Sequence, residues 1–350
     1  MQLAVKSPVN EATDTPMLGS RRGMNPSRSK KSTYHPARVT AAVLVHIPNL
    51  VGYFEHRLPV LKACLNSLVQ NAGAPLDLMV FDNASCEEVG AYLTSLHAEG
   101  RIDFLLSSHT NLGKIGALQL MFRAAPGEVV AYTDDDFYFH PGWLDAQLQV
   151  VDTYPRVGMV SGYTLPRFFA AERISANLAF AASNPAVTHR QGKFIPESWI
   201  RDWAVSSGRD PGEAVKDQAQ HQEHYLEFHG VPAYAAANHD QFLTLKSVME
   251  ACLPKTWSGN LMGDMLALDQ AVNDAGYLRL STSNRTVQHL GNRLDLTAAG
   301  GPAELPAAKP PHRQRGGRLS GWGSSILKSP PVRYLLLGVY SKLFRLVNPK

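Results

Sequence analysis

The sequence has few of the features that mark secreted or membrane-spanning proteins. It has only three cysteines among 350 residues, Cys64, Cys86 and Cys252, and no CxxC pair. This excludes a disulfide framework and a zinc–cysteine site, and it fits a reducing compartment. No long apolar stretch typical of a secretory signal is present at the N-terminus, and no uncharged run reaches the length of a spanning helix. We therefore expect a cytoplasmic location, or a peripheral one at the inner face of the membrane.

Charge is scarce and unevenly distributed. Charged residues make up 18% of the chain, and the net charge is +4. Residues 1–38 carry +5 and residues 301–350 carry +8, which leaves −9 for residues 39–300. An acidic body argues against a nucleic-acid partner. The basic ends suit an anionic membrane surface, or they are simply solvated, which we favour for the N-terminal one.

Hydropathy patterning divides the chain into four segments. Residues 1–38, rich in Ser, Pro, Arg and Lys, predict a disordered basic tail. Residues 39–162 alternate apolar strands with helices every ~25–30 residues, which predicts βαβ units in a mainly parallel sheet flanked by helices. Residues 163–297 form a second half, and residues 298–350 a basic linker with an amphipathic helix over 331–347. That helix suits a membrane interface, with docking onto protein as the alternative.

The second half shows a weaker pattern. From residue 166 to about residue 231 the alternation fails, and we expect an insertion or a second lobe on the acceptor side. The pattern returns with a strand over 231–237. We then expect helices over 240–251 and 265–275 and a last strand over 277–281.

Three consecutive aspartates, Asp134, Asp135 and Asp136, follow the apolar run 129–132. Like charges side by side cost free energy unless a positive group offsets them. The usual offset is a divalent cation held by oxygen ligands and shared with substrate phosphates. Open α/β sheets bind ligands at the carboxyl ends of their strands. We therefore predict a metal–phosphate site here, although a helix N-cap would account for one of the three.

Other strand ends of the first half also carry polar side chains. Asp82 and Asn83 end the second predicted strand, where Asp82 can accept hydrogen bonds from a base or ribose. Asn111, Gly113 and Lys114 precede a helix, so its backbone N–H groups and the lysine ammonium can face a phosphate. Taken singly, these residues read as an ordinary turn and an exposed lysine. Their combination favours a nucleotide site.

Four segments in register resemble family 2 glycosyltransferases of the GT-A fold. They are residues 80–85 (VFDNAS), 111–117 (NLGKIGA), 132–136 (YTDDD) and 140–144 (HPGWL). The resemblance covers residues 39–162 well and residues 231–292 more weakly. It implies a Rossmann-like fold and an inverting, metal-dependent transfer of a sugar from a nucleotide-diphosphate donor to a glycan or lipid-linked acceptor. Mn²⁺ or Mg²⁺ would be the cofactor, and polysaccharide biosynthesis the setting.

The resemblance also implies residue roles. It assigns metal binding to Asp136, with Asp134 and Asp135 at the ribose and around the metal's water shell. Asp82 corresponds to the carboxylate that meets the nucleobase, and Lys114 to a basic position near the nucleotide.

An inverting transfer needs a base that takes the proton of the acceptor hydroxyl. Family members carry this carboxylate before a late helix, which corresponds here to Asp264, although Gly263 replaces the glutamate common in the family. Asp269 is the second candidate. The alternatives are an N-cap role for Asp264 and, for Asp269, a solvated helix position, which we prefer. His289 lies in a segment similar to the family's late Val-x-His, which implies a metal or diphosphate contact, with a structural histidine as the alternative.

Two other functions stay open at this level. A nucleotidyltransferase can have a similar sheet and a similar acidic metal site. Such an enzyme would be expected to carry a glycine-rich loop with a basic residue directly after the first strand. Residues 46–49 (HIPN) do not supply one. A catalytically inactive, membrane-associated GT-A scaffold is favoured only by the missing glutamate at Gly263.

Overall fold

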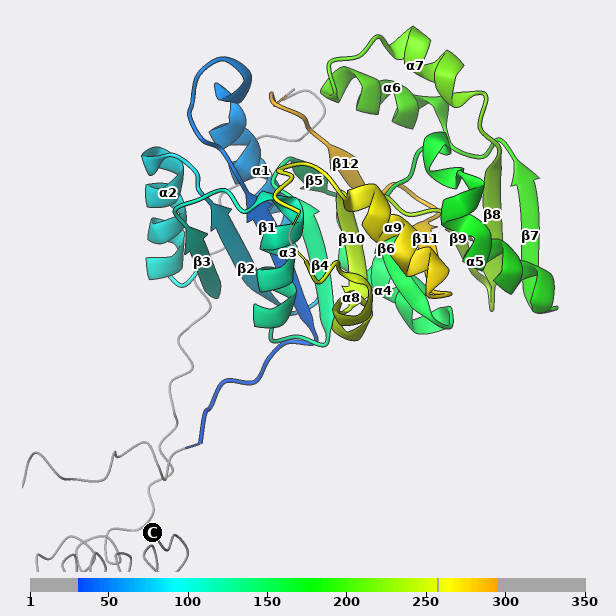
Figure 1. Ribbon diagram of the computed structural model, residues 1–350, viewed down its shortest axis with the longest axis horizontal. Coiled ribbons are helices and arrows are strands. Elements are labelled where there is room, and N and C mark those ends of the chain that lie inside the picture. The colour runs from blue at the N-terminus through cyan, green and yellow to red at the C-terminus, as the bar shows by residue number, and fades with distance from the viewer. Residues whose placement is uncertain (1–30, 257, 295–350) are drawn as a thin grey trace, which may run out of the picture. The chain divides into compact units, whose positions relative to one another are not determined.

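The computed structural model describes residues 31–256 and 258–294. All helices and strands in these ranges lie between Val39 and His289, inside the unit His35–Pro311 (Figure 1). Residues 31–38 contain neither helix nor strand. The predicted linker and the amphipathic helix over 331–347 lie outside the described residues, as does most of the basic tail. No helix in the described ranges is both long enough and apolar enough to cross a membrane.

The first half alternates strands and helices as predicted. Its elements are β1 (Val39–Val45), η2 (Gly52–Phe54), α1 (Arg57–Gln70), β2 (Leu76–Asn83), α2 (Glu87–Ala98), β3 (Phe104–Ser108), α3 (Gly113–Ala124), β4 (Val129–Asp134), β5 (Phe137–Phe139), α4 (Trp143–Thr153) and β6 (Val157–Ser161). Strands β3, β2, β1 and β4 are neighbours in that order and pair in parallel. Their carboxyl ends therefore meet at one edge of the sheet, where polar side chains were predicted to gather.

The second half extends the same sheet. Its elements are η3 (Pro166–Phe169), α5 (Ala171–Ser183), β7 (Val187–Gly192), α6 (Glu197–Ser206), α7 (Pro211–Gln218), β8 (Glu223–Phe228), β9 (Val231–Tyr234), β10 (Gln241–Leu245), α8 (Lys246–Cys252), α9 (Met265–Asp274), β11 (Leu278–Thr282) and β12 (Val287–His289). The full order is β3-β2-β1-β4-β10-β6-β11-β9-β8-β7. The segment predicted as an insertion or second lobe thus contributes the antiparallel strands β7 and β8 to the main sheet.

The helix predicted over 240–251 is wrong in its first part. Residues Gln241–Leu245 form β10, which runs antiparallel to both β4 and β6, and the helix begins only at Lys246. A strand covered on both faces shows no alternation of polar and apolar residues, so the local pattern did not identify it. Its polar residues are buried with partners: Thr244 Oγ1, for example, donates to the carbonyl oxygen of Gly158 at 2.6 Å.

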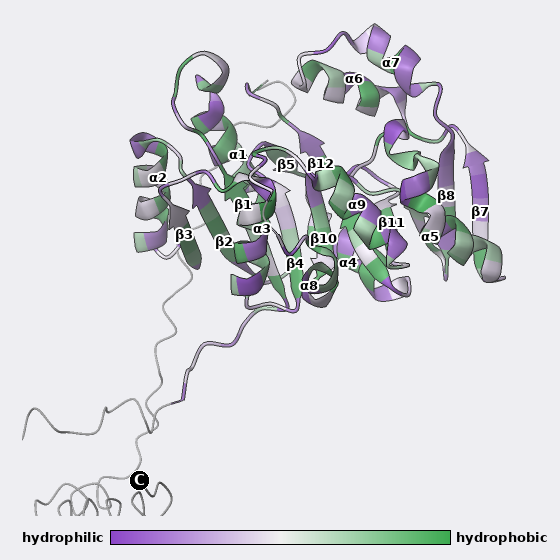
Figure 2. Cartoon of the chain, viewed as in Figure 1, coloured by the Kyte–Doolittle hydropathy of each residue, from purple (hydrophilic) through white to green (hydrophobic). Residues whose placement is uncertain are grey.

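Helices cover both faces of the sheet. Val43 and Val45 of β1 belong to one apolar cluster with residues of α1, α2 and α4, whereas Ala42 and Leu44 belong to a second with residues of α3, α8 and α9. Burial on both faces explains why the central strands read as unbroken apolar runs. Figure 2 shows these strands as hydrophobic and the edge strand β7 as hydrophilic, in keeping with the exposure of β7. The fold class predicted from the sequence, a mainly parallel α/β sheet flanked by helices, is confirmed.

Candidate active site

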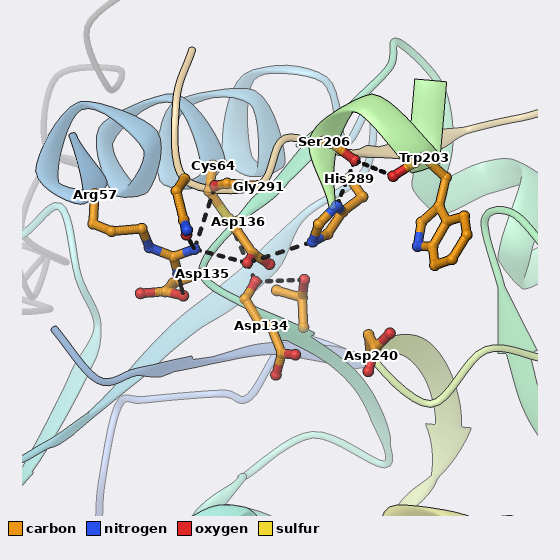
Figure 3. Close-up of polar contacts among 12 residues, drawn as sticks. Arg57, Cys64, Asp134, Asp135, Asp136, Trp203, Ser206, Asp240, His289 and Gly291 are labelled. Atoms are coloured by element: carbon orange, nitrogen blue, oxygen red, sulfur yellow. Dashed lines mark hydrogen bonds and ion pairs between the residues drawn. The ribbon is translucent and has the colours of Figure 1, made fainter. Parts of the chain in front are cut away.

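The three aspartates lie at the carboxyl end of β4, and each has a different environment (Figure 3). Lys114 Nζ lies 2.5 Å from Asp134 Oδ2. Arg57 donates to both of the others: Nη2 bonds to Asp135 Oδ1, and Nη1 lies 2.8 Å from Asp136 Oδ2. The Asp135 side chain is 7% exposed, against 18% for Asp134 and 17% for Asp136. Each carboxylate of the cluster thus has a basic partner, and Asp134 and Asp136 are more accessible to solvent than Asp135.

Arg57 is a site residue that the sequence did not reveal. It is the first residue of α1 and is only 7% exposed. Besides the two carboxylates, Nη1 approaches the carbonyl oxygen of Gly291 at 3.3 Å and Asn292 Oδ1 at 3.2 Å. Burial acts to lower the pKa of Arg57, but the charges of Asp135 and Asp136 outweigh it and raise the pKa above its ordinary value. An arginine that begins an amphipathic helix is usually solvated, so no local signal distinguishes it.

Asp240 is a second missed residue. It immediately precedes β10, and an antiparallel strand begins where its neighbour β4 ends. The N–H of Asp134 donates to the carbonyl oxygen of Asp240 at 3.0 Å, and Lys114 Nζ lies 3.7 Å from Asp240 Oδ1. On its other side, His239 Nε2 lies 3.5 Å from the same oxygen. Asp240 was missed because residues 240–251 were predicted as a helix, so this aspartate was not expected directly before a strand next to β4.

The cluster is short of positive charge. It contains four carboxylates, those of Asp134, Asp135, Asp136 and Asp240. Two permanent cations, Arg57 and Lys114, face them, so two negative charges stay uncompensated when the histidines are neutral. Burial raises the pKa of Asp135 to about 7 even though Arg57 lies beside it, and the neighbouring aspartates act in the same direction. Such a cluster is suited to a further cation.

The pairing of β12 with β5 places His289 beside Asp136. His289 is opposite Phe137 in this antiparallel pair, and its Nε2 lies 3.6 Å from Asp136 Oδ2. Burial acts to raise the pKa of Asp136, but His289 and Arg57 outweigh it and hold the pKa below its ordinary range. For His289, burial acts to lower the pKa, and Asp136 more than reverses this. Two of the predicted metal-binding residues are thus brought together.

The donor atoms are of the right kind for a hard divalent cation. The carboxylate oxygens suit Mg²⁺ or Mn²⁺. Asp135 Oδ2 is buried and has no hydrogen-bond partner. Within residues 31–256 and 258–294, however, no three His, Cys, Asp or Glu side chains already converge on a common metal position. The guanidinium of Arg57 bridges Asp135 and Asp136 instead.

A cavity of about 350 Å³ opens at this edge of the sheet. Of the residues predicted to bind the nucleotide, five contribute to its lining: Asn83, Asn111, Lys114, Asp134 and Asp135. Asp82, predicted to meet the nucleobase, does not line it. This aspartate is 9% exposed, and its Oδ1 accepts a hydrogen bond from the N–H of Ser85 at 3.0 Å. It therefore holds the turn after β2.

The start of α3 does not offer the free amides that the sequence predicted. The N–H of Leu112 donates to Asn83 Oδ1 at 2.8 Å, and that of Gly113 to Asn111 Oδ1 at 2.8 Å. The N–H of Lys114 donates to the carbonyl oxygen of Leu261 at 3.0 Å. Side chains and a loop already occupy these three N–H groups, so they are not free to meet a phosphate. Asn111 and Lys114 are the residues of this segment that line the cavity.

The loop before α9 covers the helix start at Gly113. Gly113 has a φ of +67°, and a Cβ there would lie 2.5 Å from the carbonyl oxygen of Asn260. Only glycine allows this approach. The same loop contributes Leu261 and Met262 to the cavity, and both side chains are more than half exposed, at 53% and 76%.

The two candidates for the base lie in contrasting surroundings. Asp264 ends the covering loop, is half-buried, and occupies the N-cap position of α9 with a φ of 72°, but its side chain caps no helix amide. It accepts a hydrogen bond from Ser258 Oγ. Asp269 is 0% exposed, and its oxygens lie 2.7 Å from Arg279 Nη2 and 2.8 Å from His239 Nδ1. The solvated position preferred for Asp269 is therefore wrong, and its burial keeps it away from any acceptor.

A second, larger cavity of about 990 Å³ borders the first. The two share Tyr53 and Asp136, so the aspartate cluster lies between them. Its walls come from the end of α6, including Val205 and Ser206, and from residues 288–294. Tyr53 and Val205, two of its lining residues, are 70% and 64% exposed.

The glycosyl transferase family 2 model matches residues 52–184, a range that contains α1, the aspartates and the cavity-lining asparagines. A mannosyltransferase from Pyrobaculum calidifontis, solved with GDP-Man and Mn²⁺, shares 18% identity, with a TM-score of 0.44 over 74% of this chain and 58% of its own. TarS from S. aureus shares 13%, with a TM-score of 0.40 over 72% of this chain and 59% of its own. GalNAc-T7, solved with UDP, GalNAc and Mn²⁺, shares 12%, with a TM-score of 0.42 over 73% and 43%. The chain thus spans less than two thirds of each of these structures.

No curated protein matches the chain. The matched range nevertheless contains β2, β3 and β4, three of the four parallel strands that build the acidic edge. Residues 52–184 of the chain are thus similar to the glycosyl transferase family 2 domain.

Proposed function

We propose that the protein is an inverting, metal-dependent glycosyltransferase that takes its sugar from a nucleotide-diphosphate donor. The observation that carries this proposal is the cluster of four aspartates that faces only two permanent cations, at the carboxyl edge of a parallel sheet and beside a cavity of about 350 Å³. A bound Mn²⁺ or Mg²⁺ would supply the charge that stabilises the departing nucleotide diphosphate. Asp136, Asp134 and His289 are the proposed ligands.

The chain's own residues divide the work of holding the donor. Lys114 offers a positive charge at the cavity wall, and Asn83 and Asn111 border the same cavity from the ends of β2 and β3. These asparagines also bond to each other at 2.9 Å, which fixes the cavity wall before a ligand arrives. Asp135 also borders the cavity, but its buried carboxylate anchors Arg57.

The acceptor belongs in the cavity of about 990 Å³, because that cavity meets the donor side at Asp136. Its mixed wall, with polar groups such as Asp202 and Asn292 beside the exposed ring of Tyr53, suits the sugar ring of a glycan or of a lipid-linked acceptor. Asp264 is the proposed base, because it ends the loop that covers the donor cavity and its carboxylate is only half-buried. The charge of +8 in residues 301–350 supports a peripheral contact with an anionic membrane, as expected for lipid-linked acceptors in polysaccharide biosynthesis.

Calorimetry with nucleotide diphosphates tests the donor site. We expect UDP or GDP to bind the wild-type protein only when Mn²⁺ or Mg²⁺ is present, and Asp136→Asn to abolish this binding. Asp152→Asn is the matched control, since Asp152 is a surface carboxylate paired with Arg38. Metal-independent binding, or unchanged binding by Asp136→Asn, would contradict the proposal. A screen of nucleotide sugars by diphosphate release would then identify the donor.

A further inference from the structure

Ser206 links α6 to the candidate metal site through a short chain of hydrogen bonds (Figure 3). It is the last residue of α6, and its Oγ donates to the carbonyl oxygen of Trp203 at 2.9 Å. The same Oγ lies 2.7 Å from Nδ1 of His289. A serine hydroxyl has a single hydrogen. Because the Trp203 carbonyl takes that hydrogen, Oγ accepts from His289, and Nδ1 must carry a proton.

This bond determines what the other ring nitrogen can do. With the proton on Nδ1, the neutral imidazole leaves a lone pair on Nε2. Nε2 faces Asp136 Oδ2 at 3.6 Å, which is too long for a good hydrogen bond. Two ligands of one octahedral ion with bonds of ~2.1 Å lie about 3 Å apart. The pair is therefore close to the separation that a shared divalent cation requires.

Gly291 holds the two segments together. It has a φ of +70°, and a Cβ at this position would collide with the carbonyl oxygen of Ser206. The chain after His289 therefore packs directly against the end of α6. From the other side, the carbonyl oxygen of Gly291 accepts from Arg57 Nη1 at 3.3 Å. The distance between Ser206 and His289 is thus set by the backbone on both sides.

We propose that Ser206 is a positioning residue that fixes the Nδ1–H form of His289 and so presents Nε2 as a ligand beside Asp136. This inference rests on the proposed metal-dependent function. Ser206 lies outside the matched range 52–184, in the segment for which the sequence offered no resemblance. A part of the chain that walls the second cavity therefore also completes the cation site.

Three variants test the role of Ser206. Ser206→Ala removes the acceptor for Nδ1–H, and Ser206→Thr keeps a hydroxyl in its place. Ser183→Ala is the matched control, because Ser183 Oγ also donates to a carbonyl three residues back, that of Phe180 at 3.3 Å, but is exposed and has no histidine contact. Nitrogen-15 NMR of the metal-free protein in alkaline buffer reports the tautomer, and loss of the signal in His289→Gln identifies it. Titration with Mn²⁺ gives the affinity.

We expect wild type, Ser206→Thr and Ser183→Ala to show a protonated Nδ1 at His289 and equal Mn²⁺ affinity. Ser206→Ala should lose the fixed tautomer and bind Mn²⁺ about 10–100-fold more weakly, the usual effect of removing such a partner. The inference is overturned if Ser206→Ala keeps either the tautomer or the wild-type affinity. Absence of Mn²⁺ binding by the wild type would instead refute the proposed function, and with it the inference, while the tautomer would still report the hydrogen bond.

Discussion

The N–H of Asp134 donates a hydrogen bond to the carbonyl oxygen of Asp240 at 3.0 Å, and this bond joins the end of β4 to the start of β10. Lys114 lies between their side chains, 2.5 Å from Asp134 and 3.7 Å from Asp240. The antiparallel strand thus adds a fourth carboxylate to a site that the parallel strands begin.

Asp240→Asn should weaken binding of Mn²⁺ about tenfold, or ~1.4 kcal/mol, because it removes one negative charge from the cluster. The fold should be kept, since the bond from Asp134 uses the main-chain oxygen, which asparagine also has. Calorimetry with Mn²⁺ and a nucleotide diphosphate measures the change. Asp217→Asn, at an exposed position of α7, serves as control. Equal Mn²⁺ affinities of Asp240→Asn and wild type would show that Asp240 lies outside the field of the cation.

Arg57→Met should lower the free energy of unfolding by about 3–5 kcal/mol, because it leaves Asp135 buried without its ionic partner. Arg57→Lys keeps the charge but cannot bond both aspartates at once, so we expect an intermediate loss. Urea denaturation measures both.

Added Mn²⁺ should restore more stability to Arg57→Met than to the wild type, because the metal can offset the carboxylates that the guanidinium served. A variant as stable as the wild type without metal would argue that Asp135 is neutral in the folded protein.

Gly113→Ala and Gly142→Ala form a matched pair for the covering loop. Both glycines have a positive φ, +67° and +77°, but a Cβ at Gly142 would meet nothing within 4 Å, whereas one at Gly113 would strike the Asn260 carbonyl. We expect ~1–2 kcal/mol of destabilisation for Gly142→Ala and a larger loss for Gly113→Ala. Gly113→Ala alone should weaken donor binding, as the loop has to move. Equal losses of stability and donor affinity in the two variants would mean that the loop is not tied to the start of α3.

Asp264→Asn and Asp269→Asn should separate chemistry from stability. Asp269 is paired with the fully buried Arg279. Asp269→Asn should therefore lower the free energy of unfolding by about 3–5 kcal/mol, because Arg279 is left buried without its ionic partner. Asp264→Asn should keep the stability and lose sugar transfer, roughly 10²–10⁴-fold, while nucleotide binding persists. Thermal melts of both variants measure the loss of stability, and transfer assays measure the loss of activity. Full transfer activity of Asp264→Asn would remove it as the base.

Much of the first half could be predicted because its signals are local. Apolar runs mark the strands from β1 to β4, and polar residues such as Asn83 and Asp134 directly follow or end them. Parallel pairing brings the carboxyl ends of these strands to one edge of the sheet. The residues that line the cavity could therefore be predicted from their positions at the strand ends. The α5–β8 segment offered no such rule, because antiparallel strands at a sheet edge are half exposed and carry few apolar residues, as β7 does.

By itself, the sequence determined the α/β alternation, the acidic strand end at Asp134–Asp136 and the resemblance of residues 52–184 to family 2 glycosyltransferases, because each depends on residues close together in the chain. Only the tertiary structure decided the partners of these carboxylates. Arg57 and His289 reach them from a helix start and a short two-stranded sheet, and Asp240 adds a further carboxylate from the start of an antiparallel strand. The physical reason is that compensating buried charge requires contact within a few ångströms, and such contacts depend on how distant segments pack rather than on their spacing in the chain.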